Sequence, residues 1–320
     1  MSIAGENSAF TLVRCEDTEG WLAQRTKGIG GSDVAAIMGL SPWHTPVEAW
    51  LEKTGGAQPD DISDKPYVQF GNIMEPIIGK WYADQHPERT VRRVNAICKS
   101  KERPWAQASL DYEVRDGEWG VLEIKTARTA SDWADGVPPY YLTQIAHYMS
   151  VTGRTFADVA VFFRDTCEFA EYRVCASDID VAAIEAVVDD FWLVNVQGGA
   201  MPEVTGAASE TAALTAYYGQ PQGDFVEASD PETDEAIAIY LDAAEREKQA
   251  KAEKSEASAR LMSLIGENKG LVTSTAKVTW VRSMRETFDQ KGFKADHPDI
   301  WAEYAQKKVC NGGIRIKEVR

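Results

Sequence analysis

Two segments on either side of Asp116-Gly117 most constrain how this chain can fold. Residues 108–114 and 119–126 have the apolar and β-branched content of strands, and Asp-Gly is a typical turn between paired strands. A turn with an odd number of residues, centred on Gly117, places Asp111 and Glu123 on one face of the hairpin, whereas an even turn separates them. We therefore predict a hairpin centred on Gly117 that presents both carboxylates together.

The second strand of this hairpin carries an acid and a base side by side. Because side chains alternate between the faces of a strand, Glu123 and Lys125 emerge together while Leu122 and Ile124 point into the core. Two carboxylates, waters and a phosphate form a typical Mg²⁺ site, and a nearby ammonium can position the attacking water. The pattern indicates magnesium-assisted hydrolysis of a phosphodiester, although Glu-x-Lys triplets also occur by chance.

The surrounding sequence predicts a mixed α/β region. Helices are expected at 32–39, 45–53, 70–85, 138–153 and 178–196, and further strands at 91–98, 159–163 and 168–175. Pro76 lies either in the first turn of its helix or at a kink. His147 is one helical turn after Gln144, and a structural role for it is favoured over one in the site.

Composition divides the chain into four parts. Residues 1–200 form the α/β region, and residues 201–229 are a small, polar linker with one short helix near 211–218. Residues 230–268 are predicted to form a long helical arm, because the only proline and glycine of this segment, Pro231 and Gly266, lie near its two ends. Residues 269–320 combine strand-like 273–282 and 314–317 with aromatic side chains, which predicts a small α+β cap.

Composition also limits the kind of protein. The N-terminus lacks a signal peptide and no apolar run spans a bilayer, so we expect a cytoplasmic protein. Five cysteines without a CxxC pair predict neither disulfides nor a zinc or iron–sulfur site. The net charge of −16 argues against nucleic acid, but residues 89–103 hold six basic side chains against one acidic. This patch is either a DNA contact or a solvated face.

Five sequence blocks in order resemble the YqaJ-type viral recombinase family, the lambda exonuclease-like family of PD-(D/E)XK nucleases. The blocks are Gly28-Ile29-Gly30-Gly31-Ser32-Asp33, Phe70-Gly71-Asn72-Ile73-Met74-Glu75, Ser109-Leu110-Asp111, Leu122-Glu123-Ile124-Lys125 and the segment from Tyr141 to Met149. The resemblance covers about residues 20–165. It implies a PD-(D/E)XK restriction-endonuclease-like core with a central mixed sheet flanked by helices, to which the long C-terminal helix and the small α+β cap are added.

The resemblance also implies roles for single residues. Asp111, Glu123 and the main-chain carbonyl of Ile124 would hold Mg²⁺, which Mn²⁺ can replace, and Lys125 would be the catalytic lysine. Glu75 would join the site through metal or water, and Gln144 would orient the attacking water or a phosphate.

Two residues near the N-terminus complete the implied site. Arg25 and Ser32 would bind the 5′-phosphate of the strand being digested, although Ser32 can also be a plain capping residue. Tyr112 stands where the family commonly has a smaller residue, which leaves the groove shape open.

The activity implied is that of a 5′ to 3′ exonuclease acting on double-stranded DNA ends in phage-type recombination. The implied partners are DNA ends, a single-strand annealing protein and a homo-oligomer, a trimer by resemblance, in the cytoplasm of a bacterial host. A structure-specific or single-strand endonuclease of the same fold is an alternative. A noncatalytic DNA-binding scaffold built around the helical arm is a third reading, which five intact site residues disfavour.

Overall fold

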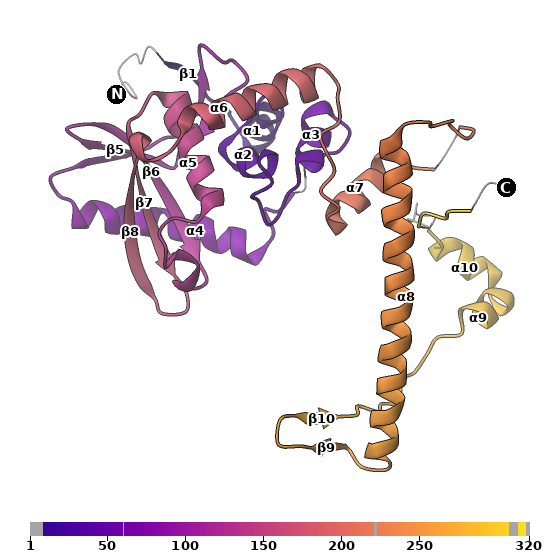
Figure 1. Ribbon diagram of the computed structural model, residues 1–320. Helices are drawn as coiled ribbons and strands as arrows, with labels where there is room; N and C mark the ends of the chain where they lie inside the picture. The colour runs from indigo at the N-terminus through magenta and orange to yellow at the C-terminus, as the bar shows by residue number, and fades with distance from the viewer. Residues whose placement is uncertain (1–8, 60, 221–222, 307–312, 318–320) are drawn as a thin grey trace. The chain divides into compact units, whose positions relative to one another are not determined.

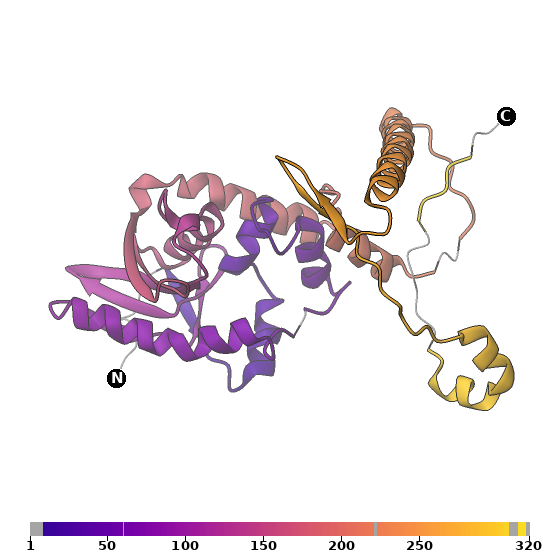
Figure 2. The ribbon, with the colours of Figure 1, turned by 90° about the horizontal axis from the view of Figure 1, so that it is seen from below.

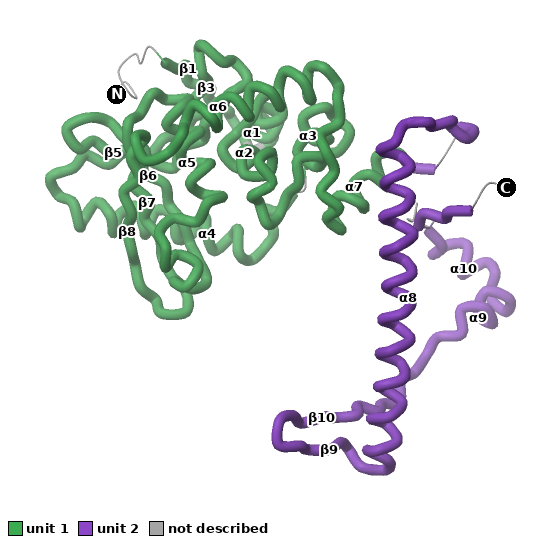
Figure 3. Tube along the Cα trace, viewed as in Figure 1, with its two compact units in different colours: residues 1–218 green, residues 219–320 purple. Residues whose placement is uncertain are grey.

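The computed structural model describes residues 9–59, 61–220, 223–306 and 313–317. The chain forms two compact units, residues 1–218 and 219–320 (Figure 3). Within the described residues no helix is long and apolar enough to cross a membrane. The described cysteines, Cys15, Cys98, Cys167 and Cys175, are free thiols, and Cys310 lies outside the described residues.

A five-stranded mixed sheet forms the centre of the first unit, with the strand order β2-β5-β6-β7-β8 (Figure 1). The strands are β2 (Thr90–Arg93), β5 (Tyr112–Asp116), β6 (Glu118–Ala127), β7 (Phe156–Phe163) and β8 (Glu168–Cys175). Within this sheet, the β6–β7 pairing is parallel and the other three are antiparallel. A parallel pair needs a crossover, and helix α5 (Pro139–Thr152) supplies it.

The predicted hairpin is confirmed in its register. Strands β5 and β6 pair from Tyr112↔Leu122 to Asp116↔Glu118, which centres the hairpin on Gly117. Gly117 has a φ of 73°, a left-handed conformation that glycine adopts without the strain a side chain would add. The turn therefore has the odd parity that brings Asp111 and Glu123 to one face.

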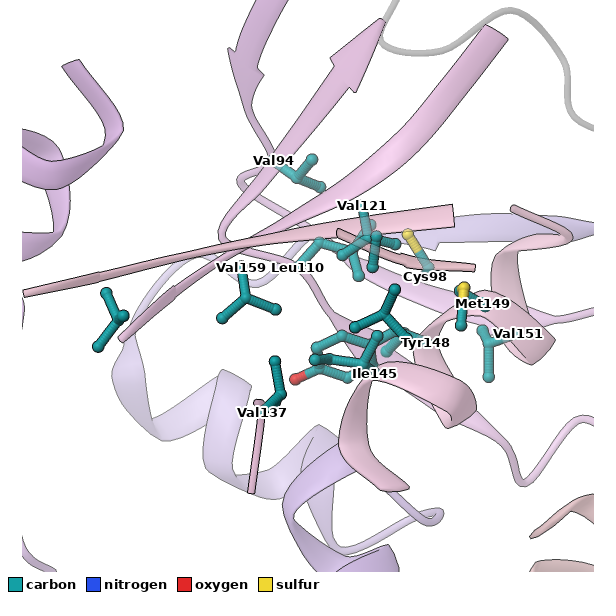
Figure 4. Packing of buried hydrophobic residues seen from close by; sticks show 14 of the residues in the cluster. Val94, Cys98, Leu110, Val121, Val137, Ile145, Tyr148, Met149, Val151 and Val159 are labelled. Carbon is teal, nitrogen blue, oxygen red and sulfur yellow. The ribbon is translucent and has the colours of Figure 1, made fainter. Parts of the chain in front are cut away.

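Helices cover both faces of the central sheet. Helix α4 (Pro66–Gln85) lies along one face (Figure 2). On this face Ile78 and Tyr82 pack against Leu122 and Ile124. Helix α5 covers the other face, where Ile145 and Met149 lie against residues of β6 and β7 (Figure 4). Strand β6 is thus buried on both sides, which confirms the central mixed sheet flanked by helices.

A second, three-stranded antiparallel sheet has the order β1-β3-β4. Its strands are β1 (Phe10–Val13), β3 (Ile97–Ser100) and β4 (Gln107–Ser109). The single strands expected at 91–98 and 108–114 are therefore wrong, since each is divided between the two sheets. The paired chains cross together at residues 94–96 and 110–111, where Val94 N–H donates to the Asp111 carbonyl at 3.1 Å.

Three short helices precede α4 in the chain. These are α1 (Thr18–Arg25), α2 (Gly31–Ile37) and α3 (Pro46–Thr54). Thr45 and Glu48 form a capping box at the start of α3, which explains why that helix begins where the sequence predicts. Helix α4 begins earlier than expected because Pro66 occupies its first turn, so Pro76 lies inside the helix.

The first unit ends in helical segments. After a 3₁₀ turn (Ala176–Asp178), α6 (Val181–Asp190) continues as a π-helix (Phe191–Gln197), and α7 (Ala208–Tyr218) follows. A further 3₁₀ turn (Ser131–Trp133) precedes α5. The helix predicted at 178–196 is thus divided into two kinds of helix.

The second unit is built on one long helix, α8 (Pro231–Ile265), whose N-terminus is capped by Asp230. A hairpin of β9 (Gly270–Val272) and β10 (Lys277–Thr279) follows, and then α9 (Gln290–Asp296) and α10 (Pro298–Tyr304). The single strand expected at 273–282 is wrong, because the Thr273 hydroxyl accepts hydrogen bonds from Thr275 N–H and Ala276 N–H and closes a turn there. Residues 314–317 form no strand.

Candidate active site

The two carboxylates lie where the hairpin meets the second sheet. Asp111 follows β4, and its Oδ2 accepts a hydrogen bond of 2.9 Å from Ile124 N–H on β6. Glu123 lies on the same strand, and its Oε1 is 2.6 Å from Lys125 Nζ. The register of β5 and β6 therefore brings all three predicted residues together.

Burial gives these groups unusual titration behaviour. Burial and the neighbouring Asp111 raise the pKa of Glu123 to about 8. Burial also raises the pKa of Asp111, although Lys125 and the Ile124 N–H oppose the shift. For Lys125, burial is outweighed by Glu123 and Asp111, which raise the pKa of its ammonium. One ammonium cannot balance the charge of two ionised carboxylates, so this buried site has too little positive charge for both.

Helix α5 contributes a polar face above the carboxylates. Gln144 Nε2 donates to Glu123 Oε1 and to the Tyr148 hydroxyl, both at 2.9 Å, while its Oε1 accepts from Lys125 at 3.2 Å. Lys125 Nζ also lies 4.6 Å from the centre of the Tyr141 ring. Gln144 therefore fixes the positions of both the lysine and the glutamate.

Glu75 extends from α4 toward the same cavity, but its carboxylate is paired elsewhere. Its Oε1 is 2.7 Å from Arg93 Nη2. Burial and Asp111 raise the pKa of Glu75, and Arg93 opposes the shift. Glu75 is thus close enough to Asp111 for the Asp111 charge to raise its pKa, while the ion pair with Arg93 holds its carboxylate in the observed position.

The residues expected to bind a 5′-phosphate are in contact with each other. Arg25 Nη2 donates to Ser32 Oγ at 3.0 Å, and the guanidinium lies 4.8 Å from the centre of the Trp21 ring. Ser32 is in the first turn of α2, which packs so closely on α5 that a Cβ on Gly31 would lie 2.4 Å from Tyr148 Cε1. Glycine at this position allows the two helices to approach.

A buried ion pair between Lys53 and Asp33 stabilises the segments that carry Arg25 and Ser32. Lys53 Nζ is 2.6 Å from Asp33 Oδ2 and donates to the Arg25 carbonyl at 3.1 Å. Asp33 Oδ2 also accepts from Gly30 N–H at 2.8 Å. Burial opposes ionisation of Asp33, but Lys53 and Arg25 hold its pKa below the ordinary value. Lys53 therefore ties the end of α1 to the start of α2.

One cavity of about 410 Å³ joins these groups. Its lining includes every predicted site residue: Arg25, Ser32, Glu75, Asp111, Glu123, Ile124, Lys125 and Gln144. Tyr112 does not narrow it, because its ring packs against Gly79 of α4 on the opposite face of the sheet. Tyr112 is not among the residues that line the cavity.

The donor set fits a hard cation. Glu123 Oε2 is buried and has no hydrogen-bond partner among the described residues, an arrangement that costs free energy unless a further group binds there. Carboxylate oxygens and a main-chain carbonyl are the ligands that Mg²⁺ prefers. No cluster of three or more His, Cys, Asp or Glu side chains in the described residues forms a complete cation site, so a metal would rely on Asp111, Glu123 and the Ile124 carbonyl.

Four of the six basic side chains in the patch at residues 89–103 form ion pairs within the protein. Arg92 pairs with Glu113, Arg93 with Glu75, and Arg103 with Glu185 and Asp189. Arg89 pairs with Asp116 and Asp158. These four arginines are therefore not a free surface for phosphates.

His147 has a structural role, as favoured from the sequence. It is fully buried, and Nε2 lies 3.1 Å from the Ile29 carbonyl and 3.0 Å from the Gln107 carbonyl, so this nitrogen carries the proton and donates. The residues that sequence reasoning missed are Tyr141, Tyr148 and Lys53. Tyr141 and Tyr148 lie three residues before and four after Gln144, a spacing that places them on one helix face, whereas Lys53 has no local signal.

The comparison with protein families covers this whole region. The model of the YqaJ-like viral recombinase domain matches residues 20–155, which contain every predicted site residue from Arg25 to Gln144. Residues 20–155 are thus similar to the YqaJ-like viral recombinase domain. This similarity supports a nuclease, and the matched residues include the two carboxylates and the lysine that line the cavity.

The chain is also similar to a curated protein and to solved structures. The chain is 28% identical over 304 residues to the uncharacterized protein YqaJ of Bacillus subtilis (strain 168), covering 93% of this chain and 94% of that one. A match of this length includes most of residues 219–320.

The solved structures are similar over a shorter part of the chain. The alkaline exonuclease LHK-Exo of Laribacter hongkongensis, in complex with dAMP, is 25% identical with a TM-score of 0.48, covering 57% of this chain and 94% of that one. SSO0001 is 18% identical with a TM-score of 0.35, covering 55% and 85%.

Proposed function

We propose that this chain is a magnesium-dependent exonuclease that hydrolyses linear double-stranded DNA from the 5′ end. The observation that carries the proposal is Glu123, whose buried Oε2 lacks a partner while its Oε1 is held by Lys125 and Gln144. A site that fixes one oxygen of a carboxylate and leaves the other free is suited to a cation. Asp111 and the Ile124 carbonyl would complete the protein ligands.

Each side chain then has a defined task in phosphodiester hydrolysis. Mg²⁺, when bound, supplies positive charge to the phosphate and lowers the pKa of water. Lys125 places an ammonium beside the carboxylates, where it offsets charge that develops on the phosphate. Gln144, already bonded to Lys125 and Glu123, orients the water or a phosphate oxygen. Glu75 joins this arrangement once Arg93 releases it.

The polarity of digestion is argued from Arg25 and Ser32. A guanidinium and a hydroxyl in contact form a phosphate-binding pair, and this pair lines the same cavity as the carboxylates. A terminal 5′-phosphate bound there leaves the next phosphodiester for the carboxylates. Arg25→Ala should therefore reduce cleavage of 5′-phosphorylated ends selectively, by about tenfold if one charge-assisted hydrogen bond is lost. Equal effects on 5′-phosphate and 5′-hydroxyl ends would argue against this pocket.

The experiment that tests the function is digestion of linear duplex DNA labelled at either end, with a closed circle as the control, in Mg²⁺ or EDTA. We expect release of the 5′ label only with Mg²⁺, and an intact circle. Cutting of the circle would indicate the structure-specific or single-strand endonuclease instead. Absence of cleavage with Mg²⁺ or Mn²⁺ would favour the noncatalytic DNA-binding scaffold.

The setting we propose is phage-type recombination in a bacterial cytoplasm, together with a single-strand annealing protein. The proposed homo-oligomer is a trimer, by resemblance to the family. Sedimentation of the full chain at several concentrations, alone and with DNA, tests this state: a species of three times the 35.4 kDa chain mass supports it, and a monomer throughout contradicts it.

A further inference from the structure

Trp43 is an exposed tryptophan outside the lining of the cavity, connected to it through the rings of Tyr140 and Tyr141. Its side chain is 66% exposed, on the segment between α2 and α3. The hydroxyl of Ser41 accepts hydrogen bonds from the N–H groups of Trp43 and His44, both at 3.2 Å. His44 is in turn ion-paired with Glu48 and Glu52 of α3. The backbone that carries the indole is therefore anchored on both sides.

Aromatic contacts connect Trp43 to the catalytic lysine. The Trp43 and Tyr140 rings meet edge-on, with centroids 5.2 Å apart and planes at 84°. The Tyr140 and Tyr141 centroids are 4.4 Å apart, and Tyr141 contacts Lys125 and lines the cavity. In an edge-on contact the edge of one ring lies against the face of the other. At least one face of the Trp43 indole is therefore not covered by Tyr140.

The size of the cavity bears on what reaches it. A space of about 410 Å³ is in the range of sites for single small molecules, and Glu123 at its floor is almost fully buried. The phosphodiester to be cut must enter this space, because Glu123 lines it and is almost fully buried. Separation of the terminal base from its partner would let this phosphodiester approach Glu123 without the rest of the duplex.

We propose that Trp43, supported by Tyr140, is a stacking platform for an unpaired base of the DNA end bound at the carboxylates. The proposal rests on the proposed function and adds a binding site to it. A separated base loses its stacking neighbours, and an exposed aromatic face replaces them without regard to sequence, since every base has a π-face. The acidic neighbours Glu48 and Glu52 are paired with His44, which suits contact with a base more than with a phosphate.

The test compares Trp43→Ala, Trp43→Phe and Tyr218→Ala in the full chain. Tyr218 is a matched control, because it is also 66% exposed and also packs on a neighbouring ring, that of Tyr217, which contacts Trp50 and not a residue of the cavity. On linear duplex DNA with Mg²⁺, Trp43→Ala should lower kcat/KM by about 5- to 150-fold. Trp43→Phe should restore most of the loss, and Tyr218→Ala should match the wild type.

A direct readout uses DNA with 2-aminopurine, a base whose fluorescence falls on stacking, at each of the last three positions. Cleavage is stopped by Lys125→Ala. One position should be quenched in the Lys125→Ala protein and in its Trp43→Phe derivative, and the quench should disappear in the Trp43→Ala derivative.

Several outcomes overturn the platform. An active wild type whose Trp43→Ala variant keeps its kcat/KM would refute the platform and leave the exonuclease intact. A change of sedimentation in Trp43→Ala with unchanged cleavage would assign the indole to contact between copies of the chain. A wild type that cuts no DNA would remove the proposed function and the platform together.

Discussion

Charged side chains are used in opposite ways in the two units of this protein. In the first unit Glu113, Glu123 and Asp158 are buried, and each contacts an arginine or lysine. Along α8, pairs such as Lys251–Glu247 and Arg260–Glu256 are spaced four residues apart and lie in solvent. The only buried residue of α8 is Ile265.

The difference lies in what each kind of pair can do. A buried pair is strongly oriented and is costly to break, because removal of one partner leaves an uncompensated charge. A solvated pair at i, i+4 supports a helix slightly and positions nothing else. Chemistry is therefore expected where the charges are buried, and α8 is expected to behave as a solvated arm.

The largest effect should follow removal of the buried ammonium at the site. Lys125→Ala should lower kcat for DNA cleavage by at least about 100-fold, because two acids with raised pKa values lose their nearby positive charge. Steady-state cleavage and circular dichroism measure activity and folding separately. Lys251→Ala on α8 is the control and should cleave at the wild-type rate. Near-normal cleavage by Lys125→Ala would remove the lysine from the mechanism.

A second comparison sets a buried lysine against an exposed one. Lys53→Met should lower the free energy of unfolding by about 3–5 kcal/mol, because Asp33 is left buried and unpaired. Lys251→Met should leave denaturant unfolding unchanged, since its partner Glu247 is in solvent. Replacing Asp33 as well, by Leu, should recover part of the loss. If Lys53→Met and Lys251→Met were equally stable, burial would not explain a difference between the ion pairs of the two units.

The pH dependence of stability gives a smaller and graded effect. Burial lowers the pKa of His147 to about 4, against about 6.5 in an unfolded chain. The unfolded state therefore binds more protons between these values, and stability present above pH 6.5 should fall by about 1.4 kcal/mol per pH unit toward pH 4. Unfolding from pH 7 to 4.5, with His147→Gln as the comparison, measures this slope. The free energy of unfolding of His147→Gln should depend less steeply on pH than that of the wild type. An equal slope in both proteins would assign the pH dependence to other groups.

The smallest effect is expected from removing the second unit. A chain ending at Tyr218 retains both sheets of the first unit and all three hydrophobic clusters. Its denaturant midpoint should stay close to that of the first unit in the full chain, since the removed helix contributes one buried residue. Failure of the shortened chain to fold would show that the two units depend on each other, contrary to the comparison.

Local patterns in the sequence were sufficient to predict the centre of the site. The turn at Gly117 determines that Asp111 and Glu123 share a face, and helical spacing places Gln144 above them. The assignment of a catalytic role to each of these residues remains a prediction.

What local patterns could not predict depends on distant partners. The division of the strands at residues 94–96 and 110–111 results from two sheets meeting, a property of the packed chain. The arginines of residues 89–103 looked available to DNA because their acidic partners, such as Glu185 and Asp189, are far away in the sequence. Lys53 was missed for the same reason, since Asp33 is twenty residues earlier.

The one-residue turn at Gly117 also limits how this hairpin can change during evolution. Inserting or deleting a single residue between Asp111 and Glu123 would reverse the facing of one strand and move one carboxylate to the α4 side of the sheet. Insertions of two residues would preserve the facing of both. Functional homologues should therefore differ in the length of this hairpin only by even numbers of residues, unless a β-bulge absorbs the odd one.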